Sequence, residues 1–274
     1  MSVMVTGASG RLGKELVSRL RECYEVYALT KKELDVTNKE NVHNLLHKLK
    51  PACIFHCAAY TDVDVCEDEY ERAFEINSFG TLNIAKAAKE AFADLVYIST
   101  GHVFDGMKKS PYLEKDKPNP INVYGESKRL GERFVLLVHP ESYVIRTSWL
   151  YGKSSHNFVN MVLEKAKQEE EIRVINDQFG SPTNIQDLAE TLTTVTKYPY
   201  GIYHISNEGC CSWFELAQYI YKKAGVDQSL VVPVPSEPGK LPARRPAYSA
   251  LGGNADFQMR SWKEALNEYI HEAL

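Results

Sequence analysis

The chain has no long apolar run, no block of like charge and no paired cysteine motif. No stretch approaches the roughly 20 apolar residues that a helix needs to span a bilayer, and the N-terminus lacks the charged and apolar regions of a signal peptide. The formal net charge is -4 with the signs interspersed, so no basic stripe offers a surface for nucleic acid. These absences predict a cytoplasmic protein that binds neither membrane nor nucleic acid.

The six cysteines show neither a disulfide framework nor the paired spacing of a zinc site, and we expect them to be reduced thiols. A metal cluster of Cys53, His56, Cys57 and Cys66 is the alternative, but residues 53–57 are predicted to lie along a strand, where alternate side chains face opposite ways. We therefore expect these cysteines to be small buried hydrophobic side chains. His43 and His47 share one face of a polar predicted helix and are expected to be solvated. The sequence therefore predicts no metal site.

What the chain does have is a glycine-rich turn near its start. An apolar run over residues 2–5 leads into Gly7, Gly10 and Gly13, and a helical pattern of leucines begins at Leu12. In dinucleotide-binding folds such glycines allow a tight bend, close approach to a pyrophosphate and close packing of helix on strand. A plain glycine-rich turn is the alternative, but the strand-turn-helix context favours a dinucleotide site.

A second motif places Tyr124 and Lys128 four residues apart, which on a helix puts a phenol and an ammonium on one face. The neighbouring cation is expected to lower the pKa of Tyr124 toward neutrality, so that Tyr124 can donate a proton. The same spacing also occurs on solvated helices. Here, however, it follows a predicted strand that delivers Ser99 and Thr100 to the carboxyl edge of the sheet, where ligands bind in open α/β folds.

The order of predicted elements indicates the fold class. Strands are expected at 2–5, 25–29, 52–56, 95–100 and 143–146, with helices at 39–49, at about 68–89, after Leu12 and around Tyr124. Because strands and helices alternate, residues 1–150 are predicted to form an α/β, Rossmann-type, doubly wound parallel sheet that binds a dinucleotide.

Residues 151–274 are predicted to form mainly a smaller C-terminal α/β lobe for the substrate, with a segment near 184–205 returning to the first domain. Helices are expected near 157–169, 184–197 and 212–224, and shorter strands at 172–175 and 202–205. The proline-dense stretch from Val231 to Pro246 ends in Arg244 and Arg245. It is a plain linker or, as we prefer, a semi-rigid loop over an anionic ligand.

Taken together, these residues resemble the extended short-chain dehydrogenase/reductases and, within them, the dTDP-4-dehydrorhamnose reductase family. The resemblance covers nearly the whole chain. The glycine turn and the Tyr124–Lys128 pair are common to the superfamily. More particular to the family are the segments VFDG at 103–106, DQFGSPT at 177–183 and RRP at 244–246.

The resemblance implies reduction of the 4-keto group of a dTDP-4-dehydro-6-deoxyhexose, giving dTDP-L-rhamnose or a close relative for surface polysaccharide. The implied catalytic residues are Thr100, Tyr124 and Lys128. The expected cofactor-binding residues are Gly7, Ser9, Gly10, Arg11, Leu12, Lys31, Asp35, Val36, Ala58, Ala59, Tyr60, Asn77, Tyr124 and Lys128. The expected substrate-binding residues are Thr61, Val63, Thr100, His102, Trp149, Asn157, Gln178 and Arg244.

The end of the second predicted strand bears on the choice of cofactor. An acidic residue there would bind the ribose 2′-OH and favour NAD, but the chain has Lys31 and Lys32 and no carboxylate until Glu33. Lysines suit a 2′-phosphate. The sequence therefore predicts a preference for NADPH, with use of NADH and a solvent-facing role for the lysines left open.

The chain departs from the family at Gly101 and His102, where the family usually has Asp-Tyr and the tyrosine reaches the substrate. His102 is expected to donate a hydrogen bond to a hydroxyl instead, and the exact sugar stays open. The tail from Leu251 to Asn254 also departs from the more helical, polar segment of the family.

Two alternatives to this activity stay open. One is a reductase of another nucleotide-linked keto sugar. The other is a noncatalytic NADP-binding subunit, similar to the regulatory β subunit of methionine adenosyltransferase. The family also contains metal-bridged dimers, so a homodimer is a further expectation, although no spacing in the chain indicates ligands for a bridging ion.

Overall fold

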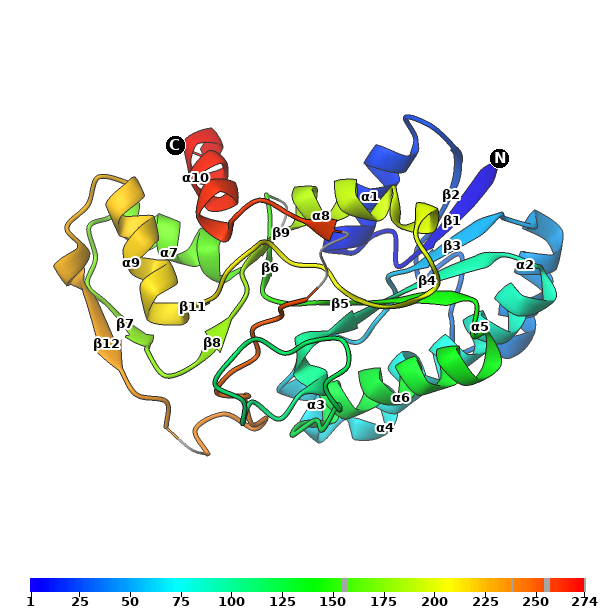
Figure 1. Cartoon of the computed structure of the whole chain (residues 1–274), viewed down its shortest axis with the longest axis horizontal. Coiled ribbons are helices and arrows are strands. Elements are labelled where there is room, and N and C mark those ends of the chain that lie inside the picture. The colour runs from blue at the N-terminus through cyan, green and yellow to red at the C-terminus, as the bar shows by residue number, and fades with distance from the viewer. Residues whose placement is uncertain (154–156, 238, 254–256, 274) are drawn as a thin grey trace.

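A computed structural model describes residues 1–153, 157–237, 239–253 and 257–273. Pro238 of the proline-dense stretch and Asn254 of the divergent tail lie outside the described residues. The chain forms a sheet domain and a smaller C-terminal lobe beside it (Figure 1).

A parallel six-stranded sheet forms the centre of the sheet domain, with the strand order β10-β5-β4-β3-β1-β2. Its strands are β1 (Ser2–Thr6), β2 (Glu25–Leu29), β3 (Cys53–His56), β4 (Asp94–Thr100), β5 (Ser142–Thr147) and β10 (Gly201–His204). The prediction of an α/β fold with a parallel sheet is confirmed. The strand order reverses between β1 and β3, so the crevice for a ligand is expected at their carboxyl ends.

Helices cover both faces of the sheet (Figure 1). One face carries α1 (Arg11–Leu20) and α8 (Ile185–Leu192), and the other carries α2 (Lys39–Leu49), α5 (Thr81–Glu90) and α6 (Val123–Val138). Every residue of β3 and β5 is therefore buried, as a doubly covered parallel sheet requires. Asn38 and Asn122 begin α2 and α6, because each side chain accepts a hydrogen bond from a backbone N–H of the first turn.

The C-terminal lobe has its own core, built on Val162, Leu216 and Leu266. Its helices are α7 (Phe158–Lys167), α9 (Trp213–Lys223) and α10 (Trp262–Ala273). Its strand pairs are β6 (Leu150–Tyr151) with β9 (Thr183–Asn184), β7 (Ile172–Ile175) with β12 (Val231–Val234), and β8 (Phe179–Gly180) with β11 (Cys211–Ser212). The segment near 184–205 holds α8, which packs beside α1 on the sheet, and β10, which pairs with β5. The boundaries at 150 and 151 stay a prediction.

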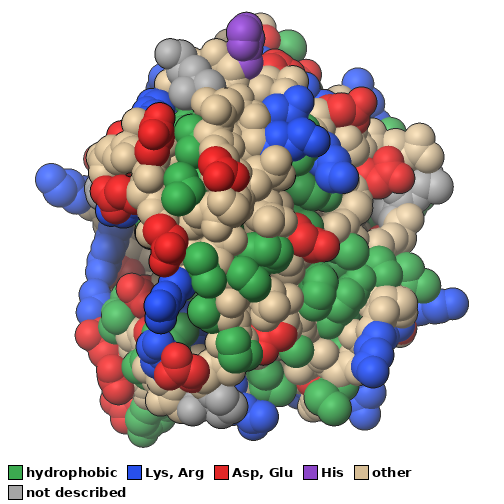
Figure 2. Space-filling model, turned by 90° about the vertical axis from the view of Figure 1, so that its left-hand side faces the viewer, with side chains coloured by type: hydrophobic (Ala, Val, Ile, Leu, Met, Phe, Trp, Pro, Cys, Tyr) green, Lys and Arg blue, Asp and Glu red, His purple; other side chains and the backbone are tan. Residues whose placement is uncertain are grey.

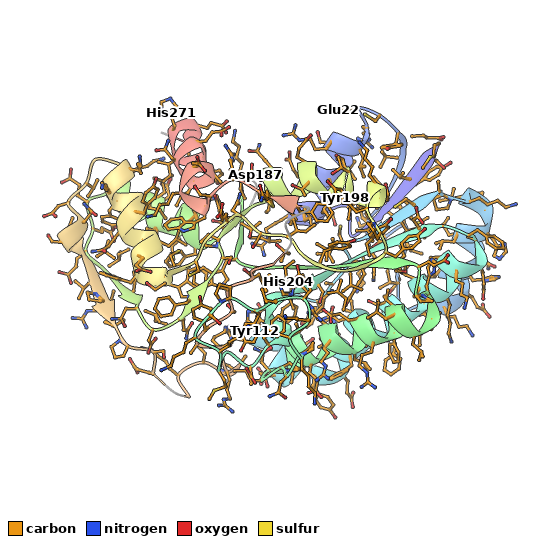
Figure 3. All side chains as sticks on the ribbon, viewed as in Figure 1. Glu22, Tyr112, Asp187, Tyr198, His204 and His271 are labelled. Atoms are coloured by element: carbon orange, nitrogen blue, oxygen red, sulfur yellow. The ribbon has the colours of Figure 1, made fainter. Side chains whose placement is uncertain are left out.

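The loop after β4 ties the sheet to the C-terminal part of the chain. His204 and Tyr112 lie near the middle of the molecule (Figure 3), and the His204 Nδ1 atom lies 2.9 Å from the Tyr112 carbonyl oxygen. The backbone N–H of His204 also donates to Glu114 (3.2 Å), and Tyr112 forms a β-bridge with Leu251. These contacts hold the loop after β4 against β10 of the sheet and against Leu251 in the C-terminal part of the chain.

The single helix predicted over about 68–89 is wrong. The structure divides this segment into α3 (Val65–Asp68), α4 (Tyr70–Phe74), a π-helix (Glu75–Gly80) and α5. Glu69 leaves the helical conformation, with φ -108° and ψ 49°. The wider π-turn contains Asn77, whose buried side chain turns inward to bind neighbouring backbone. Such a turn has no periodicity that the sequence pattern would reveal.

Two further predictions are corrected in the C-terminal part. The stretch from Val231 is not loop throughout, because Val231–Val234 forms β12 beside β7; Pro233 is tolerated there because the pair has only edge strands. The helix predicted to 197 ends at Leu192, and a 3-10 turn follows at Val195–Lys197. The closing helix α10 was not predicted.

Figure 2 shows the outer face of the C-terminal lobe, where acidic and basic side chains intermingle and hydrophobic side chains gather between them. Over the described ranges, no helix is both long and apolar enough to cross a membrane.

Candidate active site

The glycine turn after β1 fits a bound pyrophosphate. Gly7 has φ +66°, and a Cβ atom there would lie 2.6 Å from the Ala58 nitrogen. A Cβ atom on Gly13 would lie 2.3 Å from the Gly7 carbonyl oxygen, so the helix start packs directly on the turn. Gly10 precedes α1, and no described side chain caps this helix. Its first backbone N–H groups therefore face the turn, where they could donate hydrogen bonds to a phosphate.

A cavity of about 460 Å³ extends from this turn across the carboxyl ends of the strands to the C-terminal lobe. Its size is that of a small-molecule site. It brings together many of the predicted site residues, namely Gly7, Gly10, Arg11, Leu12, Ala59, Thr61, Val63, Thr100, His102, Tyr124, Lys128, Trp149, Asn157 and Gln178.

Other predicted residues lie around this cavity rather than on its wall. Ser9 is exposed in the glycine turn, and Lys31 is exposed just beyond β2. Asp35 follows in the same loop, where its Oδ1 atom accepts hydrogen bonds from the backbone and hydroxyl of Thr37. Val36 is buried next to it. This loop lies at the edge of the sheet where the adenosine half of a dinucleotide would end.

Asn77 does not line the cavity but holds a loop that does. Its Oδ1 atom accepts from the Tyr60 N–H at 2.7 Å, and its Nδ2 atom donates to the Tyr60 carbonyl at 2.9 Å and to Ser127 Oγ at 3.0 Å. It therefore holds the loop containing Ala58 and Tyr60 against α6. The Tyr60 hydroxyl itself turns away and donates to Glu69.

Thr100, Tyr124 and Lys128 all reach the cavity. Thr100 ends β4, and Tyr124 and Lys128 follow one another on α6 one turn apart, as the spacing predicts. Thr100 Oγ1 accepts a hydrogen bond from the His102 N–H (3.2 Å), which orients the hydroxyl at the end of the strand. The sheet and one helix thus bring two hydroxyl groups and one amine to a common wall.

The expected direction of the Tyr124 pKa is wrong for this structure. Burial raises the pKa of Tyr124 to about 12, and a hydrogen bond from Thr100 opposes this only in part. Desolvation of the phenolate therefore outweighs nearby positive charge. Tyr124 stays protonated at neutral pH, which is the form that a proton donor needs.

Lys128 responds to the same burial in the opposite sense. Its side chain is 2% exposed, and its Nζ atom lies 4.2 Å from the centre of the Tyr97 ring. Desolvation lowers the pKa of Lys128 to about 7, although the carboxylate of Glu132 acts to raise it. Near neutral pH the amine is therefore poised between its charged and neutral forms.

His102 presents a hydrogen-bond donor to the cavity. The Asn122 Oδ1 atom accepts from the Gly125 N–H (2.8 Å), so its Nδ2 atom must donate, both to the Arg244 carbonyl (2.8 Å) and to His102 Nδ1 (3.1 Å). Since His102 Nδ1 accepts, its Nε2 atom carries the proton. Burial lowers the pKa of His102 to about 4, which keeps the ring neutral.

The structure also places on the wall residues that the sequence did not indicate. Trp213 stacks on Trp149 with ring centres 3.4 Å apart and an interplanar angle of 7°, and Phe158 packs on Trp213. Thr147 lines the cavity with a buried Oγ1 atom that has no hydrogen-bond partner among the described residues. Thr147 pairs with Thr100 in the sheet, so its place at the carboxyl edge could have indicated it.

Arg245, not Arg244, lies on the cavity wall. Arg244 is exposed, whereas Arg245 forms a paired contact with Asp64, with its NH1 atom 3.1 Å from Oδ1 and its NH2 atom 2.8 Å from Oδ2. This ion pair joins the end of the proline-dense stretch to the loop after β3. The guanidinium that the proline-dense stretch brings to the cavity is therefore that of Arg245, one residue after the predicted Arg244.

Comparisons with known proteins show the family to which the chain belongs. Residues 1–274 match the family model described as the RmlD substrate binding domain. The chain is 42% identical to the spore coat polysaccharide biosynthesis protein SpsK of Bacillus subtilis (strain 168), covering 98% of this chain and 97% of the relative. It is 38% identical to a dTDP-4-dehydrorhamnose reductase of Aggregatibacter actinomycetemcomitans, covering 91% and 90%. A crystal structure of dTDP-4-dehydrorhamnose reductase from Bacillus anthracis str. Ames in complex with NADP superposes with a TM-score of 0.93 at 43% identity, covering 99% of each chain.

Proposed function

The chain belongs to the RmlD substrate-binding-domain family, and from that premise we propose that it reduces the 4-keto group of a dTDP-4-dehydro-6-deoxyhexose with NADPH. It is an NAD(P)H-dependent oxidoreductase of dTDP-rhamnose synthesis. The observation that carries the proposal is the placement of Thr100, Tyr124 and Lys128 on one wall of a cavity that begins at a phosphate-binding glycine turn. A purely noncatalytic subunit has no use for that set.

The residues of the wall match the needs of a ketone reduction. A nicotinamide held in this cavity would supply the hydride that the carbonyl carbon accepts. As negative charge develops on the carbonyl oxygen, the hydroxyl groups of Thr100 and Tyr124 donate hydrogen bonds that are stronger in the transition state than in the ketone. Tyr124 then transfers its proton to that oxygen. The ammonium form of Lys128 stabilises the negative charge that remains on the Tyr124 phenolate.

The finer identity of the sugar is part of the proposal. The stacked pair of Trp149 and Trp213 offers a flat apolar wall, and the His102 Nε2–H group offers a donor to a sugar hydroxyl. These features suit a sugar, and the names of the relatives support dTDP-4-dehydrorhamnose as substrate and dTDP-L-rhamnose as product. The name of the Bacillus subtilis relative supports a place in surface polysaccharide synthesis.

The test is a panel of nucleotide-linked 4-keto sugars mixed with the protein and NADPH, scored by loss of NADPH absorbance and by product identity. We expect the fastest turnover with dTDP-4-dehydro-6-deoxy-L-mannose. Absence of turnover with this sugar at every pH would contradict the proposal. Faster reduction of another nucleotide-linked keto sugar in the panel would support the alternative, a reductase of that sugar.

The choice of NADPH over NADH makes a separate prediction. Lys31 is exposed just beyond β2, whereas the Glu33 carboxylate accepts hydrogen bonds from the backbone N–H and the hydroxyl of Thr30. The exposed ammonium of Lys31 supports binding of a 2′-phosphate at this loop. We expect kcat/KM to favour NADPH, and Lys31→Glu to lower the NADPH to NADH ratio by roughly tenfold. The exposed Lys14 on α1 provides a matched control, since Lys14→Glu should leave the ratio unchanged. A wild-type protein that prefers NADH would contradict the argument.

The state of Lys128 predicts a pH dependence. Because its pKa is lowered to about 7, the amine is charged below that pH and neutral above it. If the ammonium is needed, kcat/KM should fall as the pH rises through about 7. Lys128→Arg, which stays charged, should lower the rate but remove this fall. A wild-type profile that stays level above pH 7 would show that the charge of Lys128 is not required.

The cellular setting is also a proposal. NADPH and nucleotide sugars are cytoplasmic reagents, and the six cysteines are free thiols, both of which support a cytoplasmic enzyme. The partner is the nucleotide-sugar substrate. The homodimer stays a prediction, and light scattering of the purified protein would measure it.

A further inference from the structure

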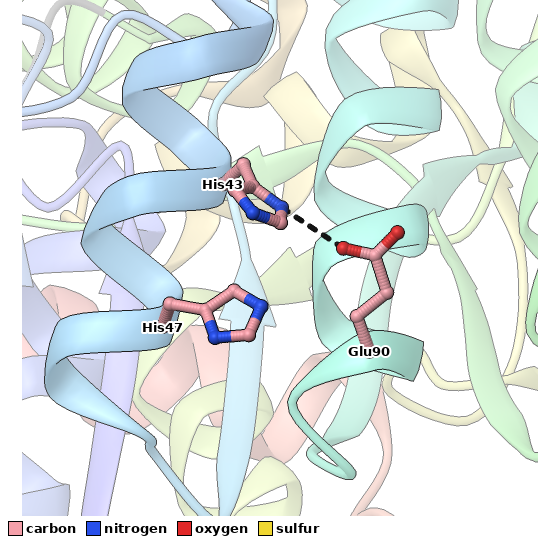
Figure 4. A group of neighbouring side chains, drawn as sticks. All are labelled: His43, His47 and Glu90. Atoms are coloured by element: carbon pink, nitrogen blue, oxygen red, sulfur yellow. Dashed lines mark hydrogen bonds and ion pairs between the residues drawn. The ribbon is translucent and has the colours of Figure 1, made fainter.

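We propose that His43, His47 and Glu90 form a binding site for Zn²⁺ at the edge of the sheet opposite the active site. His43 and His47 lie on α2 and Glu90 is the last residue of α5 (Figure 4). One ligand atom from each of the three residues can be chosen so that all lie within 4.8 Å of one another. The sequence did not indicate this group, because Glu90 lies far along the chain from both histidines.

The geometry suits a tetrahedral ion. The two histidines are four residues apart, so their rings lie on one face of α2, with ring centres 4.5 Å apart. Between the two helices, the His43 Nδ1 atom lies 2.9 Å from Glu90 Oε2. Zn²⁺ bonds of about 2.0–2.1 Å in a tetrahedron place ligand atoms roughly 3.3 Å apart. Small rotations of these side chains, all of them exposed, reach that spacing and leave the fourth position for water.

The chemistry of the donors selects the ion. Two imidazole nitrogens and one carboxylate oxygen are ligands for Zn²⁺ and similar transition metals, whereas Mg²⁺ and Ca²⁺ prefer oxygen ligands alone. In the metal-free protein the contact between His43 and Glu90 keeps one ring turned toward the carboxylate (Figure 4). Zn²⁺ would take the place of the proton between these two groups.

The surrounding backbone favours a cation as well. Both helices end at this site, α2 at Leu49 and α5 at Glu90, and the C-terminal end of a helix carries partial negative charge. The helices already pack through a shared core that includes Val42, Leu46 and Ala85. The scaffold that holds the three ligands is therefore preformed.

The position of the site predicts its effect. The two helices lead into the amino ends of β3 and β4, whereas Thr100 and the cavity lie at the carboxyl ends of the strands. Bound Zn²⁺ would join α2 to α5 and stabilise the folded protein, because the unfolded chain does not hold the three ligands together. It would not contact the substrate.

The experiment uses the full-length protein with Cys23→Ser and Cys210→Ser, since both thiols are exposed and would compete for Zn²⁺. Zn²⁺ is titrated against a chromophoric chelator in this background and in His43→Gln, His47→Gln and Glu90→Gln. Loss of a residue that only hydrogen-bonds to a metal ligand weakens metal binding by about 10–100-fold. Each of these substitutions removes a ligand itself and should weaken the binding of one equivalent of Zn²⁺ by at least roughly tenfold.

The matched control is His271→Gln, because His271 is an exposed histidine on α10, a helix far from α2 (Figure 1). It should bind Zn²⁺ as the background does. Zinc should also raise the thermal midpoint of the background, and Mg²⁺ at the same concentration should not. Equal Zn²⁺ binding by the background and by the three ligand variants, with circular dichroism showing all of them folded, would overturn the proposal and leave a surface ion pair only.

Discussion

Tyr124→Phe is expected to lower kcat by roughly 10²–10⁴-fold, the range of a general acid, while the affinity for NADPH stays the same. The substitution removes one hydroxyl from the cavity wall and keeps the ring, which packs edge-on against His102 with ring centres 5.6 Å apart. The structure therefore gives no reason for a change in folding. Steady-state kinetics with the keto sugar and a fluorescence titration of NADPH would measure the two quantities separately.

The control for this substitution is Tyr70→Phe, since Tyr70 is 54% exposed and its hydroxyl contacts only Glu71 among the described residues. It should leave kcat unchanged. Tyr124→Phe with full turnover would remove the phenol from the mechanism. If the chain were instead a noncatalytic subunit, Tyr124→Phe would leave its effect on a partner enzyme intact, and no keto sugar would be turned over by the wild type.

The sheet and the catalytic wall could be predicted because each depends on local pattern. Short apolar runs ending in Thr6, His56 and Thr100 indicate buried parallel strands, and the side chains at their carboxyl ends meet at one edge for topological reasons. The spacing of Tyr124 and Lys128 places them on one face of any helix. These features need no knowledge of contacts between distant segments.

What the sequence did not indicate depends on such contacts. Asn77 in the π-helix donates hydrogen bonds to the Tyr60 carbonyl and to Ser127 Oγ, which belong to two other segments of the chain. The pKa of Tyr124 rises because of burial, and the cation that opposes this rise is Arg11 rather than the predicted Lys128. Trp213 reaches the cavity through the packing of the C-terminal lobe on Trp149. Each of these is a tertiary effect with no local signature.

A buried ion pair lies directly behind the catalytic wall. Arg146 on β5 donates from Nε to Glu132 Oε1 (2.9 Å) and from NH2 to Oε2 (2.8 Å), and both side chains are at most 4% exposed. Ser99 donates to the same carboxylate at 2.6 Å. Glu132 lies one helical turn after Lys128 and acts to raise its pKa. The Arg146–Glu132 pair therefore has two roles: it joins β5 to α6 in the core, and its carboxylate raises the pKa of the catalytic lysine.

Arg146→Met is expected to lower the free energy of unfolding by about 3–5 kcal/mol, because it leaves the Glu132 carboxylate buried without its cation. Equilibrium unfolding in urea would measure this loss. Arg72→Met is the surface control: Arg72 is half exposed and paired with Glu69, so its loss should cost at most about 1 kcal/mol.

The double variant Glu132→Leu with Arg146→Met separates the two roles of the pair. It removes both buried charges, so most of the stability should return. Lys128, however, loses the carboxylate that raises its pKa, so the fall of kcat/KM with rising pH should move below pH 7. A double variant as unstable as Arg146→Met would mean that packing around the guanidinium, rather than the unpaired charge, accounts for the loss. A double variant with the wild-type pH profile would mean that Glu132 does not set the charge of Lys128.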